Sequence, residues 1–522
     1  MYLLCAAEMR ECDRRTIETH GVPGPTLMER AGEGIYREIR RRFDRLNRRR
    51  IWIVCGRGNN GGDGLVLARL LHDAGYNPRV FVLGPPEKAG ADARLQIDPL
   101  IARGIPLEPI GGDPPPGFGD LTSEDLLIDA ILGTGFRGRL EPELARLIRE
   151  MNRSRATIVA VDIPSGLSAD TGAIEGEAIH ARLTVTMGFP KRSFVFWPAR
   201  GQVGEWVAVD IGIPSEVMEE VAPAAELIAP SEVAASIPFF PGDAHKGVRG
   251  RLVIAGGSPG LTGAPALAAL AALRAGAGLV RVATPRSLNP ILEAKLTEPM
   301  TFPMEETEAR TLSPKGVRFL RSLASEWDAL VLGPGLGRNR GTDRLVRDLY
   351  ASWEGPLLVD ADGLNALAAG PLPASRAGLP ARVLTPHPGE MARLTATSIR
   401  EILADPIGTA RSFASRHGVV LVLKGAPTVI AGPRGPALVN TTGNPGLATG
   451  GSGDVLSGII GTLLAQRLEP LSAAMCGVHL HGLAADLLAS EGGERVVAPA
   501  EVAERLPAAW RTLPRLRGRD VR

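Results

Sequence analysis

The chain has 522 residues, which is enough for about two to four domains of roughly 150 residues each. Its 59 basic and 57 acidic side chains nearly cancel, so the chain as a whole is not a polyelectrolyte for nucleic acid or membranes. Glycine and proline make up about a fifth of the residues, below the share of low-complexity disordered chains, and 44% of the residues are hydrophobic. The composition indicates a soluble globular protein, and we expect neither a nucleic-acid nor a membrane partner.

The chain start and the cysteines indicate a cytoplasmic location. No basic region precedes the first apolar residues, and no run of about 18 uninterrupted apolar residues occurs, so we expect neither a signal peptide nor a membrane span. The four cysteines have no CxxC spacing and no HExxH motif is present, which disfavours a disulfide scaffold and a structural zinc site. Unpaired cysteines are typical of a reducing compartment.

Short β-branched runs recur along the first half of the chain, with amphipathic segments between several of them. The predicted strands are 51–55, 80–83, 126–131, 157–161 and 183–187, and a helix is predicted over 65–74, ended by Gly75. Such alternation is typical of βαβ units and a mostly parallel sheet. The first half therefore predicts an α/β domain.

A second alternating series follows a weakly patterned stretch rich in Pro, Ala and acidic residues. Its predicted strands are 252–255, 279–283, 329–332, 357–359, 383–384 and 419–423. The two halves share no obvious repeat, so two different α/β domains are predicted. We expect the first domain at 1–215, a linker at 216–240 and the second domain at 241–522.

The segment VCGRGNNGGDG (54–64) comes directly after a predicted strand and opens a helix. Gly56, Gly58 and Gly61 match the GxGxxG pattern of dinucleotide-binding folds, but the second strand ends without the acidic residue that the pattern expects. An ordinary NAD site is therefore disfavoured. The free amides of the glycine turn can face an anion, and the neighbouring Asn and Asp side chains can bind polar groups or cations.

Three charged residues stand at the ends of later predicted strands: Asp129 in LLIDAILGTGFRGRL, Asp162 in IVAVDIPSGL and Lys191 in VTMGFPK. The carboxyl ends of parallel strands border the ligand crevice of an open sheet, so we expect these groups to converge. A carboxylate and an ammonium there can act as general acid and base, or they can form a structural ion pair. Only six of the 59 basic residues are lysines. Lys191 therefore either marks a site that needs a compact ammonium or is an incidental surface residue.

The segment TTGNPGLATGGSGDVLSG (441–458) carries the clearest chemical signal of the second half. It has more glycines than core packing requires, and it leads into an apolar helix predicted over 455–465. Backbone amides at that helix start can form an anion hole bordered by Asp454, which suits a base that takes a hydroxyl proton while Gly453 and its neighbours stabilise phosphoryl charge. The alternative is a helix-capping Asp after a flexible loop.

Other strand ends of the second half also carry chemistry. Lys424 opens KGAPT, whose turn can hold nucleotide phosphates, although a plain strand-end lysine is the alternative. His387 lies between prolines in TPHPGE beside Glu390, and both a functional and a structural role are open. Further strand exits are GGSPGLTGA (256–264), LGPGLG (332–337) and DADGLN (360–365).

The motifs of the first half together resemble the NAD(P)H-hydrate epimerase domain, over roughly residues 1–215. They are EMR (8–10), LMERAG (27–32), GNNGGDG (58–64), DAILGTG (129–135), VDIPSGL (161–167) and GFPK (188–191). The resemblance implies a Rossmann-like three-layer αβα fold that interconverts the 6R and 6S hydrates of NADH and NADPH. It also implies a bound potassium ion.

By motif match, the resemblance implies Asn60, Asp129 and Ser165 as the potassium ligands, with Asp162 and Lys191 as the catalytic pair. The substrate-binding residues that it implies are Asn59, Asn60, Gly61, Gly62, Asp63, Gly133, Thr134, Gly135, Phe136, Arg137, Gly138, Arg139 and Asp162. Oxygen ligands suit a hard cation, although the residues alone do not separate potassium from sodium.

The second half resembles the ribokinase-like superfamily and, within it, the ADP-dependent NAD(P)H-hydrate dehydratases, over about residues 240–490. The motifs are HKG (245–247), GGSPGLTGA, GPGLG (333–337), DADGLN, TPHPGE, KGAPT and GNPGLATGGSGD (443–454). The resemblance implies that Ala264, Gly337, His387 and Asp454 contact the hydrated nicotinamide, with Asp454 catalytic. The nucleotide-binding residues that it implies are Lys424, Gly425, Ala426, Pro427, Thr428 and Gly453.

The two resemblances together imply a bifunctional repair enzyme, an isomerase fused to a lyase. The expected reactions are epimerisation of the hydrates and dehydration of the 6S hydrate to NADH or NADPH, with ADP as phosphoryl donor and AMP and phosphate as products. We expect potassium in the first domain, magnesium and ADP at the second, and a homo-oligomer. The alternative is a small-molecule kinase of the hydroxymethylpyrimidine or hydroxyethylthiazole type with a non-catalytic N-terminal binding domain.

Overall fold

The computed structural model describes residues 1–85, 90–373 and 378–514, and the chain divides into two compact units, Met1–Ala225 and Glu226–Arg522. The division falls inside the segment that the sequence predicts as a linker. That segment is not irregular: it contains helix α8 (Ser215–Val221), strand β8 (Ala225–Leu227) and helix α9 (Pro230–Ser236). These elements are short, so their periodicity is too brief to be seen in the sequence.

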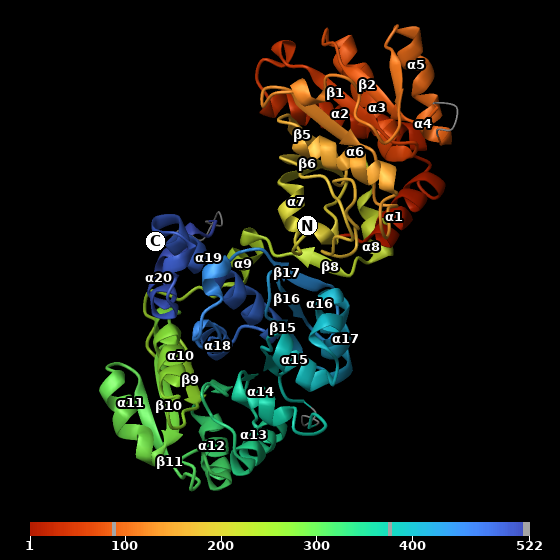
Figure 1. Cartoon of the computed structure of the whole chain (residues 1–522). Helices are drawn as coiled ribbons and strands as arrows, with labels where there is room; N and C mark the ends of the chain where they lie inside the picture. Colours follow the sequence, from red (N-terminus) through yellow and green to blue (C-terminus); the bar gives the residue numbers. More distant parts are fainter. Residues whose placement is uncertain (86–89, 374–377, 515–522) are drawn as a thin grey trace. The chain divides into compact units, whose positions relative to one another are not determined.

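The first unit, which Figure 1 shows in red to yellow, is built on a parallel sheet. Its strand order is β3-β2-β1-β4-β5-β6-β7. The strands are β1 (Ile51–Cys55), β2 (Arg79–Leu83), β3 (Leu107–Ile110), β4 (Leu126–Ala130), β5 (Thr157–Val161), β6 (Leu183–Met187) and β7 (Glu205–Val209). The helices are α1 (Ala6–Glu18), α2 (Gly24–Arg42), α3 (Asn59–Asp73), α4 (Ala91–Leu95), α5 (Ile97–Ala102), α6 (Pro142–Arg153), α7 (Arg200–Val203) and α8.

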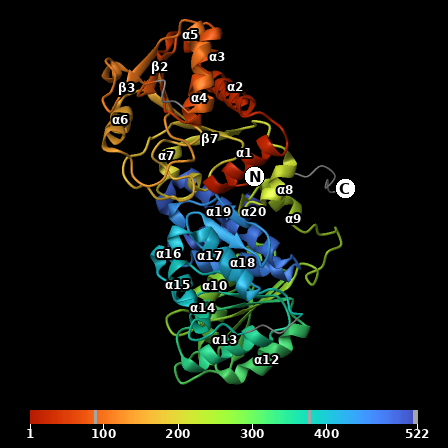
Figure 2. The same cartoon turned by 90° about the vertical axis from the view of Figure 1, so that its right-hand side faces the viewer.

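Helices cover both faces of this sheet, so the unit has three layers, as the resemblance implies. Ile51, Ile53 and Cys55 of β1 pack in one core with α2, α3 and α5, whereas the intervening Trp52 and Val54 pack in a second core with α6. Figure 2 shows α2 and α3 on the opposite side of the sheet from α6. A strand buried on both faces is apolar at every position, which is why the sequence shows it as a continuous hydrophobic run.

The second unit contains a mixed sheet with the strand order β11-β10-β9-β12-β13-β14-β15-β16-β17-β8. The strands after β8 are β9 (Arg251–Ala255), β10 (Leu279–Pro285), β11 (Met300–Met304), β12 (Ala329–Leu332), β13 (Leu357–Val359), β14 (Val383–Leu384), β15 (Val420–Leu423), β16 (Thr428–Ala431) and β17 (Ala437–Asn440). Strands β9 to β15 pair in parallel, and β16 and β17 add an antiparallel edge.

The helices of the second unit also lie on both faces of its sheet. They are α9, α10 (Gly263–Arg274), α11 (Asn289–Lys295), α12 (Val317–Ser322), α13 (Arg340–Ser352), α14 (Asp362–Leu367), α15 (Pro388–Thr395), α16 (Ile399–Ala404), α17 (Pro406–His417), α18 (Ser452–Ala465), α19 (Pro470–Gly492) and α20 (Pro499–Thr512). Val420 and Val422 of β15 join the core under α18 and α19. Leu421 and Leu423 alternate with them and point to the other face, where α17 packs.

Within the described residues, α19 is the helix that is long and apolar enough to cross a membrane. However, 67% of its most apolar window is buried inside the protein, against α18, α20 and the sheet. Its apolar character is therefore explained by its place in the core, since a fully buried helix is hydrophobic all round.

Candidate active sites

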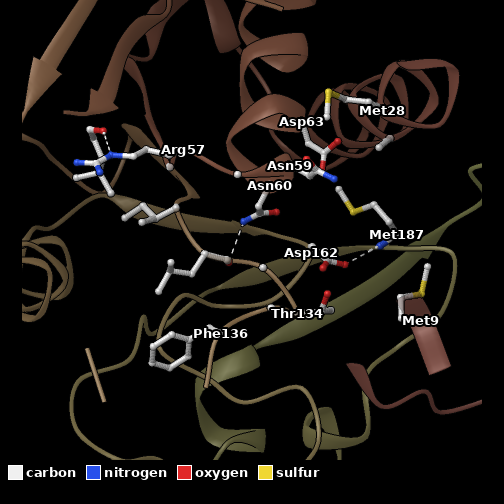
Figure 3. Close-up of a pocket in the computed structure, with 18 of the residues that line it drawn as sticks. Met9, Met28, Arg57, Asn59, Asn60, Asp63, Thr134, Phe136, Asp162 and Met187 are labelled. Atoms are coloured by element: carbon white, nitrogen blue, oxygen red, sulfur yellow. Dashed lines mark hydrogen bonds between the residues drawn. The ribbon is translucent and has the colours of Figure 1, made fainter. Parts of the chain in front are cut away.

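A cavity of ≈ 1030 Å³ lies at the carboxyl ends of the strands in the first unit (Figure 3). It sits beside β1 and β4, where the chain leaves neighbouring strands toward opposite faces of the sheet, which is the usual ligand site of an open parallel sheet. Gly61 of α3 packs closely against Gly56, the residue after β1. A methyl group on Gly61 would lie 2.0 Å from the Gly56 carbonyl oxygen, so no larger residue fits there. The turn therefore brings the start of α3 against the strand end and opens its first turn to the cavity.

Asp162 and Lys191 meet at the wall of this cavity. Asp162 follows β5 with a φ of +65°, a left-handed conformation that is uncommon outside glycine and often found at functional sites. Its Oδ1 accepts hydrogen bonds from Lys191 Nζ at 2.5 Å and from the Met187 backbone N–H at 3.3 Å. Lys191 is fully buried, and its Nζ also donates to Thr186 Oγ1 at 2.8 Å and to the Phe189 carbonyl at 3.1 Å. The ammonium is therefore fixed in place and holds the Asp162 carboxylate.

Asn60, Asp129 and Ser165 form a second cluster, buried beside the cavity. Ser165 donates through its backbone N–H and its hydroxyl to the Asp129 carboxylate, at 2.8 and 2.6 Å. Asn60 donates to the Leu132 carbonyl at 2.9 Å, but its Oδ1 is buried without a hydrogen-bond partner among the described residues (Figure 3). Burial raises the pKa of Asp129 to about 6. Leu132 N–H also donates to Ser165 Oγ at 2.9 Å, so Leu132 connects Asn60 to the Ser165–Asp129 pair. Buried oxygen donors of this kind suit a hard cation.

The remaining residues that the epimerase resemblance implies do not all reach the cavity. Those that line it are Asn59, Asn60, Asp63, Gly133, Thr134, Gly135, Phe136 and Asp162. Gly61 and Gly62 are buried within α3 and pack against Gly56 and Met28. Arg137 is paired with Asp170 at 2.9 Å, and neither it nor Gly138 and Arg139 are among the described lining residues.

One end of the cavity gathers carboxyl groups and methionines that come from separate elements. Figure 3 shows Asp63 and Asp162 near one another there, with Met9, Met28 and Met187 around them. Burial and the neighbouring carboxylates of Asp162 and Asp13 raise the pKa of Asp63 well above its usual range. Asp13 is not among the site residues predicted from the sequence, although its spacing of four from Met9 and from Ile17 indicates that the three share one helix face.

In the second unit, Asp360 follows β13 and Lys424 follows β15, and the two side chains meet. Lys424 Nζ lies 2.8 Å from Asp360 Oδ1 and 3.9 Å from Glu390 Oε2. The other carboxylate oxygen of Asp360 accepts a 2.7 Å hydrogen bond from Ser457 on α18. Strand ends and the start of α18 are thus joined through one buried carboxylate.

The start of α18 lies directly beside this ion pair. A methyl group on Gly453 would lie 3.4 Å from Lys424 Nζ and 3.6 Å from Asp360 Oδ2, so the bare backbone of the first turn faces both charges. Asp454 is in this first turn, and burial together with the Asp360 carboxylate raises its pKa to about 7. Free amides at a helix start bind anions, and a carboxyl with a pKa near neutrality can exchange protons there.

His387 has a structural part in the same region. It is the N-cap of α15, and its Nδ1 accepts hydrogen bonds from the backbone N–H groups of Gly389 and Glu390 at 2.9 and 3.4 Å. Its other ring nitrogen, Nε2, lies 3.5 Å from Glu390 Oε1, and the side chain is 51% exposed, so part of the ring borders solvent. Burial raises the pKa of Glu390 to about 7.

The other implied residues of the second unit fall into two groups. Ala264 lies in the first turn of α10, and Gly337 lies in the loop after β12. The loop before α10 contacts the loop after β12, since Gly257 N–H donates to the Pro334 carbonyl at 3.1 Å, and Gly337 N–H donates to Asp362 Oδ2 at 2.9 Å. Residues 424–427 form the turn between β15 and β16, where Gly425 and Ala426 are exposed. Thr428, the first residue of β16, donates through its hydroxyl to the Gly425 carbonyl.

Comparison with known proteins covers both units. A family model described as NAD(P)H-hydrate dehydratase matches residues 252–508, and one described as YjeF-related protein N-terminus matches residues 24–193. The bifunctional NAD(P)H-hydrate repair enzyme Nnr of Moorella thermoacetica is 43% identical over 98% of this chain and 97% of its own length. That of Escherichia coli is 38% identical over 94% of this chain and 90% of its own length.

Among solved structures, an ADP/ATP-dependent NAD(P)H-hydrate dehydratase from Bacillus subtilis, crystallised with ATP and Mg²⁺, aligns with a TM-score of 0.48 and 30% identity over 55% of this chain and 98% of its own. The full-length relatives confirm the family predicted from the motifs and do not favour the alternative of a small-molecule kinase with a non-catalytic first domain. The chain belongs to the family of bifunctional NAD(P)H-hydrate repair enzymes, which join an epimerase to a dehydratase.

Proposed function

We propose that residues 1–215 interconvert the 6R and 6S hydrates of NADH and NADPH, and that residues 241–522 dehydrate the 6S hydrate with ADP as phosphoryl donor. The observation that carries this proposal is the pair of strand-end sites, one with a cavity of nucleotide size and a buried Asp162–Lys191 pair, the other with Asp454 at an anion-binding helix start. The two sites supply different chemistry, as two successive reactions require.

In the first domain, we assign the dinucleotide to the cavity lined by the start of α3 and the loop after β4. The hydroxyl on C6 belongs to a hemiaminal, so its inversion needs proton transfer to and from oxygen while the ring nitrogen supplies electrons. Asp162 reaches the cavity and is held by Lys191, which supports its assignment as a proton-transfer group. The polar end with Asp162 and Asp63 is the reactive end in this assignment.

The cluster of Asn60, Asp129 and Ser165 fits a potassium ion. The unpaired Oδ1 of Asn60 and the buried Asp129 carboxyl are hard oxygen donors. A bound cation would supply fixed positive charge next to the loop after β4. We expect exchange of epimers to depend on K⁺ in a KCl titration at constant ionic strength, and Asp129→Asn to abolish this dependence.

In the second domain, Asp454 takes the proton of the C6 hydroxyl as the oxygen attacks the β-phosphorus of ADP and AMP leaves. Amides of the α18 start, with Gly453, face the migrating phosphoryl group, and Lys424 supplies positive charge beside them. The ring nitrogen lone pair then expels phosphate from C6, and loss of a proton from the ring restores the dihydropyridine. Ala264, Gly337 and His387 are assigned to the nicotinamide, and residues 424–428 to the nucleotide.

The second site also fits magnesium. Glu390, Asp360 and Asp454 place carboxylate oxygens around Lys424, and Mg²⁺ is commonly held by one or two carboxylates together with substrate phosphates. A bound Mg²⁺ would neutralise phosphate charge during transfer. We also propose a soluble cytoplasmic homo-oligomer, for which the four free cysteines support the reducing compartment.

The test incubates the full chain with a mixture of both epimers of hydrated NADH, ADP and Mg²⁺, and follows the absorbance of the regained dihydropyridine. Complete recovery is expected. Recovery of only the 6S share, within a time in which spontaneous exchange is negligible, would contradict the epimerase assignment. No recovery, with phosphorylation of a vitamin precursor instead, would contradict the dehydratase assignment.

A further inference from the structure

Inversion at a hemiaminal carbon has a requirement that the Asp162–Lys191 pair alone does not meet. If the C6–O bond breaks, the departing hydroxyl must gain a proton on one face of the ring, and the incoming water must lose one on the other face. Two proton-transfer groups are then needed at the reactive end of the cavity. The side chains that line this end come from α1, α2, α3 and the ends of β5 and β6.

Helix α1 presents one face to the cavity, through Met9, Asp13 and Ile17. The other acidic residues of α1 are already engaged: Glu8 binds Arg192 at 2.6 Å, Glu11 binds Arg14 at 2.7 Å and Glu18 binds Arg14 at 2.6 Å. Asp13 has no hydrogen bond or ion pair within residues 1–85, 90–373 and 378–514. It is thus a carboxyl that faces the cavity without a structural partner.

The position of Asp13 relative to Lys191 is fixed by the chain before α1. Leu4 N–H donates to the Pro190 carbonyl at 3.0 Å, and Arg192 N–H donates to the Leu4 carbonyl at 3.0 Å, so residues 4 and 191 form a parallel bridge. The Arg192–Glu8 ion pair adds a side-chain link one turn into α1. The helix that carries Asp13 is therefore attached to the segment that carries Lys191.

The electrostatic surroundings of Asp13 allow it to gain and lose a proton near neutral pH. Burial and the Asp162 carboxylate raise the pKa of Asp13 to about 6, although the Lys191 ammonium acts in the opposite direction. The other charged groups at this end are Arg10 on the same helix and Asp63 on α3. On α8, which packs against α1, Glu220 is paired with Arg15.

We propose that Asp13 is the second proton-transfer residue of the epimerase, acting with Asp162; this inference rests on the proposed function of the first domain. In one direction, the Asp13 carboxyl gives its proton to the C6 hydroxyl, the C6–O bond breaks with release of water, and the ring nitrogen lone pair forms the N1=C6 iminium. A water molecule then adds to the opposite face and gives its proton to Asp162. The reverse reaction exchanges the two roles, so no net proton is consumed.

The test compares Asp13→Asn with the matched control Glu18→Gln, an exposed carboxyl on the same helix. The rate of conversion of separated 6R hydrate is measured in the full chain by chromatography. We expect kcat for exchange to fall about 100-fold or more in Asp13→Asn with KM changed less than about threefold. Dehydration of 6S hydrate is expected to remain unchanged in the same sample. Asp13→Glu restores a carboxyl, so its kcat for exchange is expected to be at least about tenfold higher than that of Asp13→Asn.

Two further measurements separate catalysis from folding. In H₂¹⁸O, each inversion by the wild-type chain is expected to place one solvent oxygen at C6. In the direction in which Asp13 gives its proton, the wild-type rate is expected to fall as the pH rises through about 6, and this limb of the pH–rate profile is expected to disappear in Asp13→Asn. Retention of the original oxygen, or an Asp13→Asn rate and pH profile like those of Glu18→Gln, would overturn the inference. A wild-type chain that dehydrates but never exchanges epimers would instead overturn the proposed function of the first domain, and this inference with it.

Discussion

Replacing Lys191 by methionine removes a buried ammonium while keeping an unbranched side chain of similar length. Lys191 is 1% exposed, and its partner Asp162 is 14% exposed. Loss of the ammonium leaves the Asp162 carboxylate without its 2.5 Å partner, and removing one member of a buried pair costs about 3–5 kcal/mol. We expect the lower end of this range, ~3 kcal/mol, because Asp162 borders the cavity and keeps the Met187 N–H as a donor.

The double variant Lys191→Met/Asp162→Asn measures the coupling itself. It removes both charges, so its loss of unfolding free energy should be smaller than the sum of the single losses by about 1.5–3 kcal/mol. The chain has two units and need not unfold in one step, so urea unfolding is combined with hydrogen exchange of peptides that cover β6 and Lys191.

Additive losses, within about 0.5 kcal/mol, would refute this reasoning, because they would mean that the two charges do not stabilise one another. Hydrogen exchange that accelerates only in peptides of the second unit would refute it as well. Dehydration of 6S hydrate serves as the internal control, since Lys191 lies in the first unit.

Three further outcomes are expected. Gly61→Ala should lower the stability of the first unit by about 1–3 kcal/mol, because the new methyl group would lie 2.0 Å from the Gly56 carbonyl oxygen. Thermal unfolding measures this loss. Gly58→Ala is the matched control, since a methyl group on Gly58 would have no atom within 4 Å. Asp454→Asn should lower kcat for dehydration about 10²–10⁴-fold with ADP binding nearly unchanged in calorimetry, and a loss below about tenfold would contradict its role as base. The pKa of Asp454 is raised to about 7, and a base acts only when it is ionised. The rate of dehydration should therefore rise as the pH increases through about 7. A rate that stays constant from about pH 6 to 8 would argue against this ionisation.

The strands that the sequence predicted best are those buried on both faces. The predicted strands 51–55, 157–161 and 183–187 coincide with β1, β5 and β6, because continuous apolar runs mark them. The strands that were not predicted lie toward sheet edges or are antiparallel: β3, β7, β8, β11, β16 and β17. Such strands are partly exposed or short, so their apolar pattern is weak.

The helix predicted over 65–74 begins six residues earlier, at Asn59. Its first turn, NNGGD, is polar because it faces the cavity rather than the core, so hydrophobic periodicity could not indicate it. The same holds for α18, which is predicted to begin at residue 455 but begins at Ser452. Its glycine-rich first turn faces Lys424 and Asp360, so this turn carries no apolar pattern. In both cases apolar periodicity omits the first turn of the helix, which is the part that faces the candidate site.

The sequence by itself determined the two α/β units, the strand ends that carry charge, and the family, because glycine turns and strand-end carboxylates leave a local signature. Only the tertiary structure decided which charges meet: Lys191 with Asp162, Lys424 with Asp360, and Asp13 with the same cavity as Asp162. Lys191 and Asp162 are 29 residues apart and Lys424 and Asp360 are 64 residues apart, and their distances in space depend on how the strands are ordered in the sheet and where α1 attaches. Contacts of that kind arise from packing, which no single segment of sequence encodes.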